Sequence, residues 1–375
     1  MNAPELRLMT PNFELLGVID NYESMQWTRK LYEIGDVEIH INLYKNSAAL
    51  LTPGMIVFMD EARAGIIENV SIEEAKAGVT VVAKGKQLKA LVSRRITVPD
   101  AKAEDQFFGY DRFPDATAQE ADAPAESVIK HYAAAHLVNP EDKNRCIPQL
   151  LLSEDQSRGM DMRWQSRFEA LSDVFKGIGE YSGMGYDITL DLAEKKFIFD
   201  VICGQNKTSV SEHTNPIVFS SVFGNISSSK YTEDTANWIN AAYAGGSGED
   251  ENRLIHTVFE ADIPKGLERR ETFLDCGSID NIEDLKYEAS YRMSSRTVNK
   301  TISGVIAQSG TFVYMQDWDL GDVVTIQNSA LGLETDERIT EVKESYERNK
   351  FSVQPTFGVR QKNLLDEIRT VQAVR

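Results

Sequence analysis

The stretch DWDLGDVVTIQ, Asp317 to Gln327, gathers three carboxylates around a glycine and is the first place to look for chemistry. A helix-loop-helix calcium loop needs oxygen ligands at positions 1, 3, 5, 7 and 12, with glycine at position 6. Counted from Asp317, position 6 is Asp322 and position 12 is Asn328, so the spacing argues against calcium. The stretch instead predicts a turn at LGD before a strand VVTIQ, with Asp317, Asp319 and Asp322 facing solvent.

His131 and His136, five apart in HYAAAH, are the next candidates for a metal site. Zinc-binding pairs on a helix are four apart because i and i+4 share a face, so a spacing of five should turn the second ring away. Cys146, Cys203 and Cys276 are odd in number and include no C-x-x-C pair. They indicate neither a zinc knuckle nor a disulfide framework, and favour folding in a reducing cytoplasm.

Other catalytic motifs are incomplete. The segment CGQNKTS, 203–209, resembles half of a phosphate-binding loop but lacks the second glycine. GIGEYSGMG follows a predicted helix, whereas a dinucleotide fingerprint follows a strand, and no G-x-S-x-G nucleophile elbow occurs. A glycosidase pair could hide among the 58 Asp and Glu residues, but nothing singles one out. We therefore predict no catalytic, cofactor-binding or metal-binding residue, and no enzyme.

Composition describes a folded protein with more than one domain. The 375 residues are too many for one ordinary core, and the chain is 26% charged and 42% hydrophobic. The longest apolar run, Met55–Met59, is far shorter than the roughly 20 residues of a membrane-spanning helix. The N-terminus MNAPELRLMTPNF lacks the basic and apolar regions of a secretory signal. We expect no membrane span and no export.

The net charge of −18 argues against stable nucleic-acid binding. Such binding needs clustered Lys and Arg to displace counterions from phosphates, and acidic residues outnumber basic ones here by 58 to 40. An acidic surface repels DNA and anionic membranes, yet a repelled polymer can slide past it. The simpler alternative is that the acidic charge only aids solubility.

Short strands should dominate the first hundred residues. In DVEIHINL, Val37, Ile39, Ile41 and Leu43 alternate with polar residues, which predicts a half-buried strand. Pro53-Gly54 marks a turn before MIVFM, and EEAKAG reads as a hairpin loop between GIIENVSI and VTVVAKG. Short helical turns are expected at 46–51 and 86–92. Many closely spaced strands favour a barrel or sandwich.

The middle of the chain should be a long arm followed by helices. The stretch 99–122 is rich in Ala, Asp and Pro without periodicity, which indicates a long loop. Pro124 suits the first position of a helix, and an apolar face predicts a second helix over 165–178 that Gly177 and Gly179 would end. YDITLDL and KFIFDVI should form a hairpin.

Strands return in the second half, with one helix among them. The segments PIVFSSVF, NWINAAYA and RLIHTVFE read as strands, and NIEDLKYEASYRM as a helix capped by Asp280 or Asn281. A short amphipathic helix is predicted at 363–374. The predicted division is an N-terminal β-barrel tube domain (1–98), an arm with a helical insertion (99–190), a second β-rich tube domain (191–270), and a helix with a C-terminal β domain and tail (271–375).

Several segments carry a family resemblance. VFSSVFGNISSSKY, RRETFLDC, and the run from DWDLGDVVTIQ to SVQPTFG resemble the siphovirus gene-product-thirty-seven-like tail protein family. Near the N-terminus, GVIDNYESMQWTRKLYEIGDVEIHI, AGIIENVSI and VAKGKQLKALVSRRI fit its opening strands. The resemblance runs from Gly17 to Gly358, and the stretch 99–122 carries no part of it.

The resemblance implies an α+β, β-rich fold with two tube-type β-barrel domains and a helix-containing insertion, similar to phage baseplate hub proteins. It implies a virion protein without catalytic residues or cofactors, assembled in the bacterial cytoplasm. Its homotrimeric ring would join the hexameric tail tube to a threefold tip or spike. Tail-tube ring proteins, and a tape-measure protein, would be its partners in host attachment and genome ejection.

Two alternatives stay open. The first is a tail-associated cell-wall hydrolase, which would need a domain of its own that the family-like segments leave no room for. The second is a receptor- or carbohydrate-binding tip module, whose expected sign is a cluster of exposed aromatic residues. Trp27, Trp164, Trp238 and Trp318 are spread widely and are expected in the core.

Overall fold

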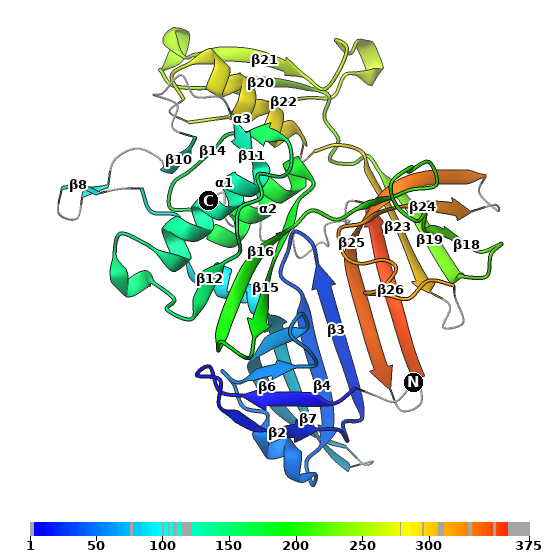
Figure 1. Cartoon of the computed structure of the whole chain (residues 1–375). Coiled ribbons are helices and arrows are strands. Elements are labelled where there is room, and N and C mark those ends of the chain that lie inside the picture. Colours follow the sequence, from blue (N-terminus) through cyan, green and yellow to red (C-terminus); the bar gives the residue numbers. More distant parts are fainter. Residues whose placement is uncertain are drawn as a thin grey trace. The chain divides into compact units, whose positions relative to one another are not determined.

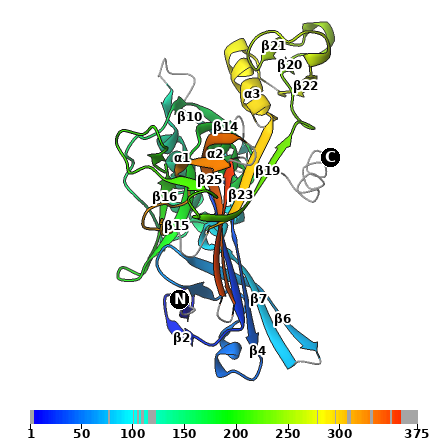
Figure 2. The ribbon, with the colours of Figure 1, turned by 90° about the vertical axis from the view of Figure 1, so that its right-hand side faces the viewer.

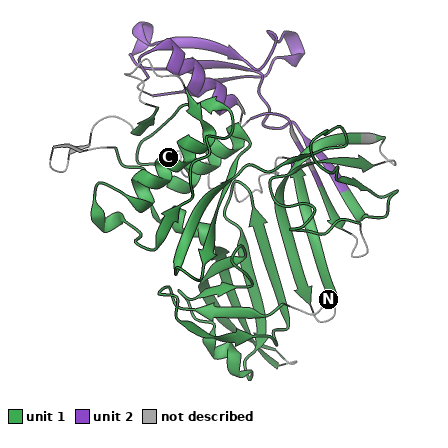
Figure 3. Cartoon of the chain, in the orientation of Figure 1, with its two compact units in different colours: residues 1–229, 303–357 green, residues 230–302, 358–375 purple. Residues whose placement is uncertain are grey.

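The computed structural model contains two compact units (Figures 1 and 3). It describes residues 4–75, 78–99, 101–103, 106–107, 111–114, 122–277, 279–294, 296–306, 311–328, 332–347 and 350–358. Unit 1 comprises Met1–Ser229 and Ser303–Phe357, and unit 2 comprises Lys230–Ile302 and Gly358–Arg375. The protein is a β-rich α+β structure, as predicted.

The largest sheet joins the two ends of the chain. Its main path runs β19-β23-β26-β25-β3-β4-β7-β6-β5-β1-β2. In it β3, from the N-terminal part of the chain, pairs with β25, from the C-terminal part. The strands of this path are β1 Leu6–Met9, β2 Leu15–Ile19, β3 Ser24–Lys30, β4 Asp36–Asn42, β5 Ile56–Phe58, β6 Ala64–Ala75, β7 Gly78–Gln87, β19 Ile226–Asp234, β23 Asn299–Ile306, β25 Leu333–Glu347 and β26 Lys350–Gly358.

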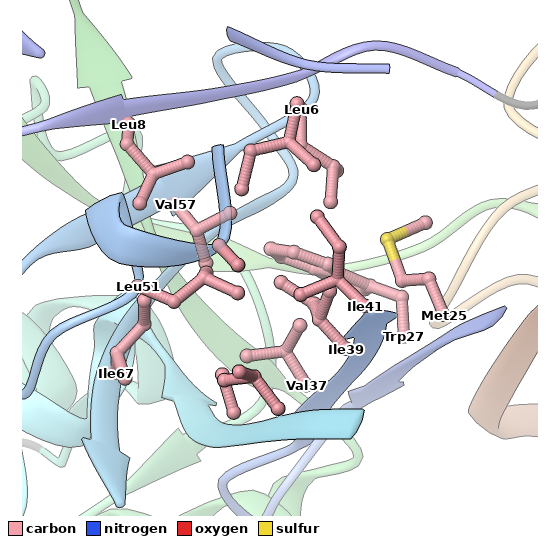
Figure 4. Close-up of a cluster of buried hydrophobic side chains, with 14 of the residues drawn as sticks. Leu6, Leu8, Met25, Trp27, Val37, Ile39, Ile41, Leu51, Val57 and Ile67 are labelled. Carbon is pink, nitrogen blue, oxygen red and sulfur yellow. The ribbon is translucent and has the colours of Figure 1, made fainter. Parts of the chain in front are cut away.

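The N-terminal strands enclose an apolar core (Figure 4). Val37, Ile39 and Ile41 point into it because successive side chains of β4 alternate between faces, which confirms the predicted strand. Trp27 of β3 is fully buried beside them. Leu43, expected on the same face, lies beyond the end of β4 and is exposed, so that part of the prediction was wrong.

Local predictions in this region hold with shifted boundaries. The two short helical turns are 3-10 helices at Asn46–Leu50 and Leu88–Arg94, the second of which begins two residues later than expected. The predicted hairpin forms between β6 and β7, but both strands extend into EEAKAG, so the connection is shorter than predicted.

The insertion packs two helices near a small sheet. It contains α1 Ala125–Ala133, a π-helix Ala134–Val138, a 3-10 turn Lys143–Arg145 and α2 Leu171–Ser182. Its strands are β8 Ala101–Ala103, β9 Gln106–Phe107, β10 Asp111–Phe113, β11 Ala123–Pro124, β12 Leu150–Leu152, β13 Asp161–Met162, β14 Trp164–Ser166, β15 Gly185–Asp191 and β16 Lys196–Ile202. The predicted hairpin is β15–β16, with β12 parallel to β16.

Three predictions for the insertion were wrong. The second helix begins at Leu171 because the chain first forms β14 and then turns at Phe168, whose φ is 53° and whose side chain is exposed. Gly177 and Gly179 lie inside the helix, which ends instead at Gly183 in the left-handed conformation. The described part of 99–122 contains short strands rather than only loop, and the rest lies outside the described residues.

The remaining strands of unit 1 are β17 Asn206–Lys207, β18 Val218–Ser220 and β24 Val323–Asn328, with β17 and β18 parallel to β24. Phe219, Trp318 and Phe357 form a buried aromatic cluster there. The helix predicted at 363–374 lies outside the described residues.

Unit 2 is a three-stranded sheet with one helix. The sheet order is β21-β20-β22, from β20 Ala241–Gly245, β21 Ile255–Phe259 and β22 Glu271–Asp275. Short 3-10 turns occur at Asp250–Asn252 and Gly266–Glu268. Helix α3, Ile282–Ser294, packs Leu285 and Ala289 against one face of the sheet. Asn281 caps it as predicted, since its side chain accepts from the N–H of Asp284 at 2.8 Å. No helix among the described residues could cross a membrane.

Candidate functional site: a buried ionic cluster and an exposed strand edge

The three carboxylates of the DWDLGD stretch point to three different places. Asp317 is exposed and accepts from the N–H of Val313 at 2.7 Å. Asp322 is only 4% exposed and accepts from the N–H of Gln205 and from Lys207, both at 2.8 Å. The predicted turn leads into β24 as expected. The prediction that all three carboxylates face solvent was wrong, because Asp322 is buried and accepts hydrogen bonds from Gln205 and Lys207.

The third carboxylate, Asp319, belongs to a cluster around Arg29 of β3. Arg29 is 5% exposed, and its guanidinium lies 2.8 Å from Asp319 and 2.9 Å from the Tyr314 hydroxyl. Asp187 of β15 approaches it at 3.6 Å. Burial alone would lower the pKa of Arg29, but Tyr314, Asp319 and Asp187 hold it well above its usual value. The cluster therefore links the N-terminal sheet, the insertion and the C-terminal segment within unit 1.

Lys89 is a second buried cation next to Arg29. Its ammonium group donates to the backbone carbonyls of Lys30, Leu31 and Tyr186, and lies 4.8 Å from the centre of the Tyr186 ring. Burial lowers its pKa to about 8. A lysine with this pKa could act as a nucleophile, but the side chain is fully buried and its acceptors are backbone carbonyls. We therefore assign it a structural role.

A third buried group joins β25 to the β5–β6 connection. Glu344 is 1% exposed and contacts Arg63 at 2.8 Å and the Tyr346 hydroxyl at 2.5 Å. Burial raises the pKa of Glu344, and Arg63 in turn bonds Asp60. Sequence reasoning missed Arg29, Lys89 and Glu344, since nothing in their local sequence shows which distant residues they meet. The ion pairs of Arg29 with Asp319 and of Glu344 with Arg63 join residues almost 300 positions apart, and the acceptors of Lys89 lie 58 to 97 positions away.

The prediction that His131 and His136 point in different directions was wrong. His131 and His136 both contact Asp111, with Nε2 to carboxylate distances of 3.2 and 2.7 Å. The rings share a face because α1 continues as a π-helix, which has more residues per turn than an α-helix. Their hydrogen bonds to Asp111 lower its pKa to about 2 even though burial raises it. Among the described residues, no group of three or more His, Cys, Asp or Glu side chains could hold a metal ion.

The segment that resembles half of a phosphate-binding loop, 203–209, has its lysine bonded within the protein. Lys207, its only lysine, bonds Asp322 and the carbonyl of Asp317. Phosphate would have to displace both acceptors, so the structure gives no support to a nucleotide site here. The clusters described above bind one part of the fold to another, and an interaction surface must be sought elsewhere.

Strand β2 offers such a surface. It lies at the end of the main sheet path and pairs, among the described strands, with β1 alone. Leu15, Leu16 and Val18 are 63%, 41% and 43% exposed. A strand edge with exposed apolar side chains is a template for pairing with another chain.

The β6–β7 hairpin is a second exposed feature of unit 1 (Figure 2). From Glu68 onward the side chains of β6 are exposed or half-buried, and Ile72 is 62% exposed. Glu73 and Glu74, near the end of β6, are also exposed. Val81 on the same face as Ile72 is buried, so the apolar face of the hairpin continues the core outward.

Three solved structures share this fold over almost their whole lengths. The 43 kDa tail protein of prophage MuSo2 from Shewanella oneidensis has a TM-score of 0.59 and 11% identity, covering 95% of this chain and 98% of that one. A tail protein from Neisseria meningitidis MC58 has a TM-score of 0.55 and 11% identity, covering 95% and 97%. Prophage tail protein gp18 from Listeria monocytogenes EGD-e has a TM-score of 0.55 and 10% identity, covering 99% of both chains.

The sequence comparisons give the family. No curated protein sequence matches the chain. The family described as Siphovirus ReqiPepy6 Gp37-like protein matches residues 5–359, which confirms the resemblance carried by the segments between Gly17 and Gly358. The chain therefore belongs to the Siphovirus ReqiPepy6 Gp37-like family and has a fold that it shares with prophage tail proteins.

Proposed function

We propose that the protein is a structural component of a phage tail tip, and that it assembles as a homotrimeric hub ring. The observation that carries the proposal is the fold shared with prophage tail proteins along nearly the entire chain, together with the family match over residues 5–359. In this proposal the ring joins the hexameric tail tube to a threefold tip or spike.

The surfaces of unit 1 support assembly. A closed ring would cover the apolar edge of β2, where Leu15 is 63% exposed, and would remove a strand edge that otherwise invites aggregation. An acidic chain with a net charge of −18 suits a passage for DNA, because like charge prevents the polymer from adhering. The four-segment division at residues 98, 190 and 270, with two tube domains, is part of the proposal.

The proposal assigns the protein no enzymatic role. The buried charges of Arg29, Lys89 and Glu344 link segments of the fold, and the phosphate-loop lysine Lys207 is bound to Asp322. The proposed location is the virion, after assembly in the bacterial cytoplasm. Tail-tube ring proteins, a tip or spike protein and a tape-measure protein are the proposed partners in attachment and genome ejection.

Particle images and copy number test the proposal. We expect three copies per particle, at density with threefold symmetry next to the tube, and no turnover of peptidoglycan by the purified chain. A double variant, Leu15→Ser with Val18→Ser, should reduce incorporation into particles. Val210→Ser, which changes a 77% exposed residue elsewhere in unit 1, is the matched control. Six copies, absence from the tip, or lytic activity would refute the proposal.

A further inference from the structure

One face of the unit 2 sheet carries exposed aromatic rings and arginines. We call Tyr243, Phe259, Phe273, Arg253 and Arg269 the aromatic–arginine face. Tyr243 and Phe273 are 40% and 51% exposed, and Phe259 is half-buried. Helix α3 covers the opposite face of the sheet, where Ala242, Ala244 and Leu274 are buried. The sheet therefore presents its aromatic side outward, the reverse of what burial of apolar surface favours.

Strand register brings these residues together. Tyr243 of β20 lies opposite Phe273 of β22. Ala241, two positions earlier and on the same face of β20, lies opposite Phe259 of β21. Adjacent strands are about 4.8 Å apart, so the Tyr243 and Phe273 rings stand side by side on one face. The three rings come from separate segments of the sequence, so nothing in the local sequence shows that they form a cluster. Trp238, expected in the core, is itself half-exposed and bonds Glu260.

Arg253 is held in place beside Phe273. Its guanidinium donates to the carbonyls of Gly246 and Gly245 at 3.0 and 3.3 Å, and to Asp275 at 2.5 Å. The guanidinium carbon lies 5.3 Å from the centre of the Phe273 ring. A Cβ on Gly245 would come within 2.5 Å of that ring and 3.0 Å of Arg253. Glycine at this position makes room for both side chains, and several bonds fix the cation.

Arg269 forms a second pair next to Tyr243. It donates to Glu271 at 2.6 Å and to the Tyr243 hydroxyl at 3.2 Å. Its guanidinium carbon lies 6.0 Å from the centre of the Tyr243 ring and 5.6 Å from that of Phe259. Each exposed ring therefore has a fixed group of hydrogen-bond donors and a carboxylate acceptor beside it.

This combination selects a neutral ligand that is rich in hydroxyl groups. Each arginine is matched by a carboxylate, so an anion such as a nucleic-acid phosphate would meet Glu271 or Asp275, and a cation would meet Arg253 or Arg269. A tightly packed protein partner would have to remove water from two ion pairs, which is unfavourable. A sugar ring has one C–H face that can stack on an aromatic ring, and hydroxyls that both donate and accept hydrogen bonds.

We propose that the aromatic–arginine face binds a neutral carbohydrate chain, with sugar rings stacked on Phe273 and Tyr243. The sugar hydroxyls bond the Arg253–Asp275 and Arg269–Glu271 pairs in place of water. This binding site belongs to unit 2 alone and does not depend on the trimer proposed above.

Saturation-transfer NMR on the full chain tests the proposal. The probes are tetrasaccharides of glucose, galactose, mannose, rhamnose and N-acetylglucosamine, each titrated separately. We expect saturation transfer to at least one of them, strongest at the C–H protons of one sugar face. Phe273→Ala should weaken binding at least tenfold. Tyr243→Phe keeps the ring, removes the hydroxyl bond to Arg269, and should weaken binding less.

The controls separate binding from folding and from protein contacts. Leu267→Ala removes a fully exposed aliphatic side chain of unit 2 outside the face and should leave binding unchanged. Circular dichroism should show that all variants remain folded at the temperature of the binding experiment, so that a loss of binding reflects the changed side chain and not unfolding. Absence of transfer from all five probes, or equal loss in Leu267→Ala, would overturn the proposal. Concentration-dependent self-association that Phe273→Ala abolishes, without sugar binding, would assign the face to a protein interface instead.

Discussion

Replacing Asp322 should show how strongly the DWDLGD turn holds unit 1 together. Asp322 accepts hydrogen bonds from the backbone N–H groups of Gln205 and Asp319, at 2.8 and 2.9 Å, and from Lys207 at 2.8 Å. The Asp322→Ala variant removes a charged partner, at a cost of about 1.5–3 kcal/mol, and leaves buried donors unpaired, which adds about 1–3 kcal/mol. We expect a loss of about 4 kcal/mol in the free energy of unfolding.

Thermal unfolding followed by near-ultraviolet circular dichroism measures this loss. For a unit of this size, each kcal/mol shifts the melting temperature by about 2 °C, so we expect a decrease of about 8 °C. Asp317→Ala is the matched control from the same turn, because Asp317 is exposed and accepts one backbone N–H. Its melting temperature should fall by about 2 °C or less. An equal decrease in melting temperature for the two variants would refute the argument that the buried hydrogen bonds of Asp322 stabilise the turn.

Three further predictions concern other parts of unit 1. Burial raises the pKa of Glu126, but bonds from Arg158 and Lys130 lower it to about 2. Ionised Glu126 therefore stabilises the folded state fully above its unfolded pKa near 4.5, and this contribution is lost as pH falls toward 2. The melting temperature should therefore fall less between pH 6 and pH 3 in Glu126→Gln than in the unchanged chain, and parallel curves would contradict this. The melting temperature of Gly204→Ala should be several degrees lower than that of Gly224→Ala. Both glycines have φ near 65°, but only at Gly204 would a Cβ meet another atom closely, the carbonyl oxygen of Gly321 at 1.9 Å. Leu15→Ser with Val18→Ser should leave the melting temperature of the monomer within about 2 °C, because both residues are exposed, while sedimentation shows weaker trimer formation; an unfolded variant would show that β2 stabilises the monomer instead.

Patterns that depend on neighbours in sequence were predictable. The alternation of Val37, Ile39 and Ile41 identified β4, and Asp280 or Asn281 was expected as the cap of the helix in NIEDLKYEASYRM, a role that Asn281 fills. The family segments also indicated the fold, which the whole-chain likeness to prophage tail proteins confirms. These features succeed because a strand or helix imposes its period on adjacent residues.

The features that failed depend on tertiary context or on an unusual local geometry. The shared face of His131 and His136 needs a π-helix, and a rule built on α-helical spacing excludes it. Asp322 is buried because Lys207 and Gln205 come to it from a distant segment. The aromatic–arginine face was missed because only strand register places Tyr243 beside Phe273.

The pairing of β3 with β25 has a consequence for synthesis of the protein. Lys30 pairs with Glu341, so the ribosome must make more than three hundred further residues before β3 gains this neighbour. At about 5–20 residues per second, one edge of β3 has no pairing strand for roughly 15–60 s. During this interval β3 and its still-uncovered Arg29 are open to wrong partners, and chaperones that shield emerging strands should raise the yield of correctly folded chains.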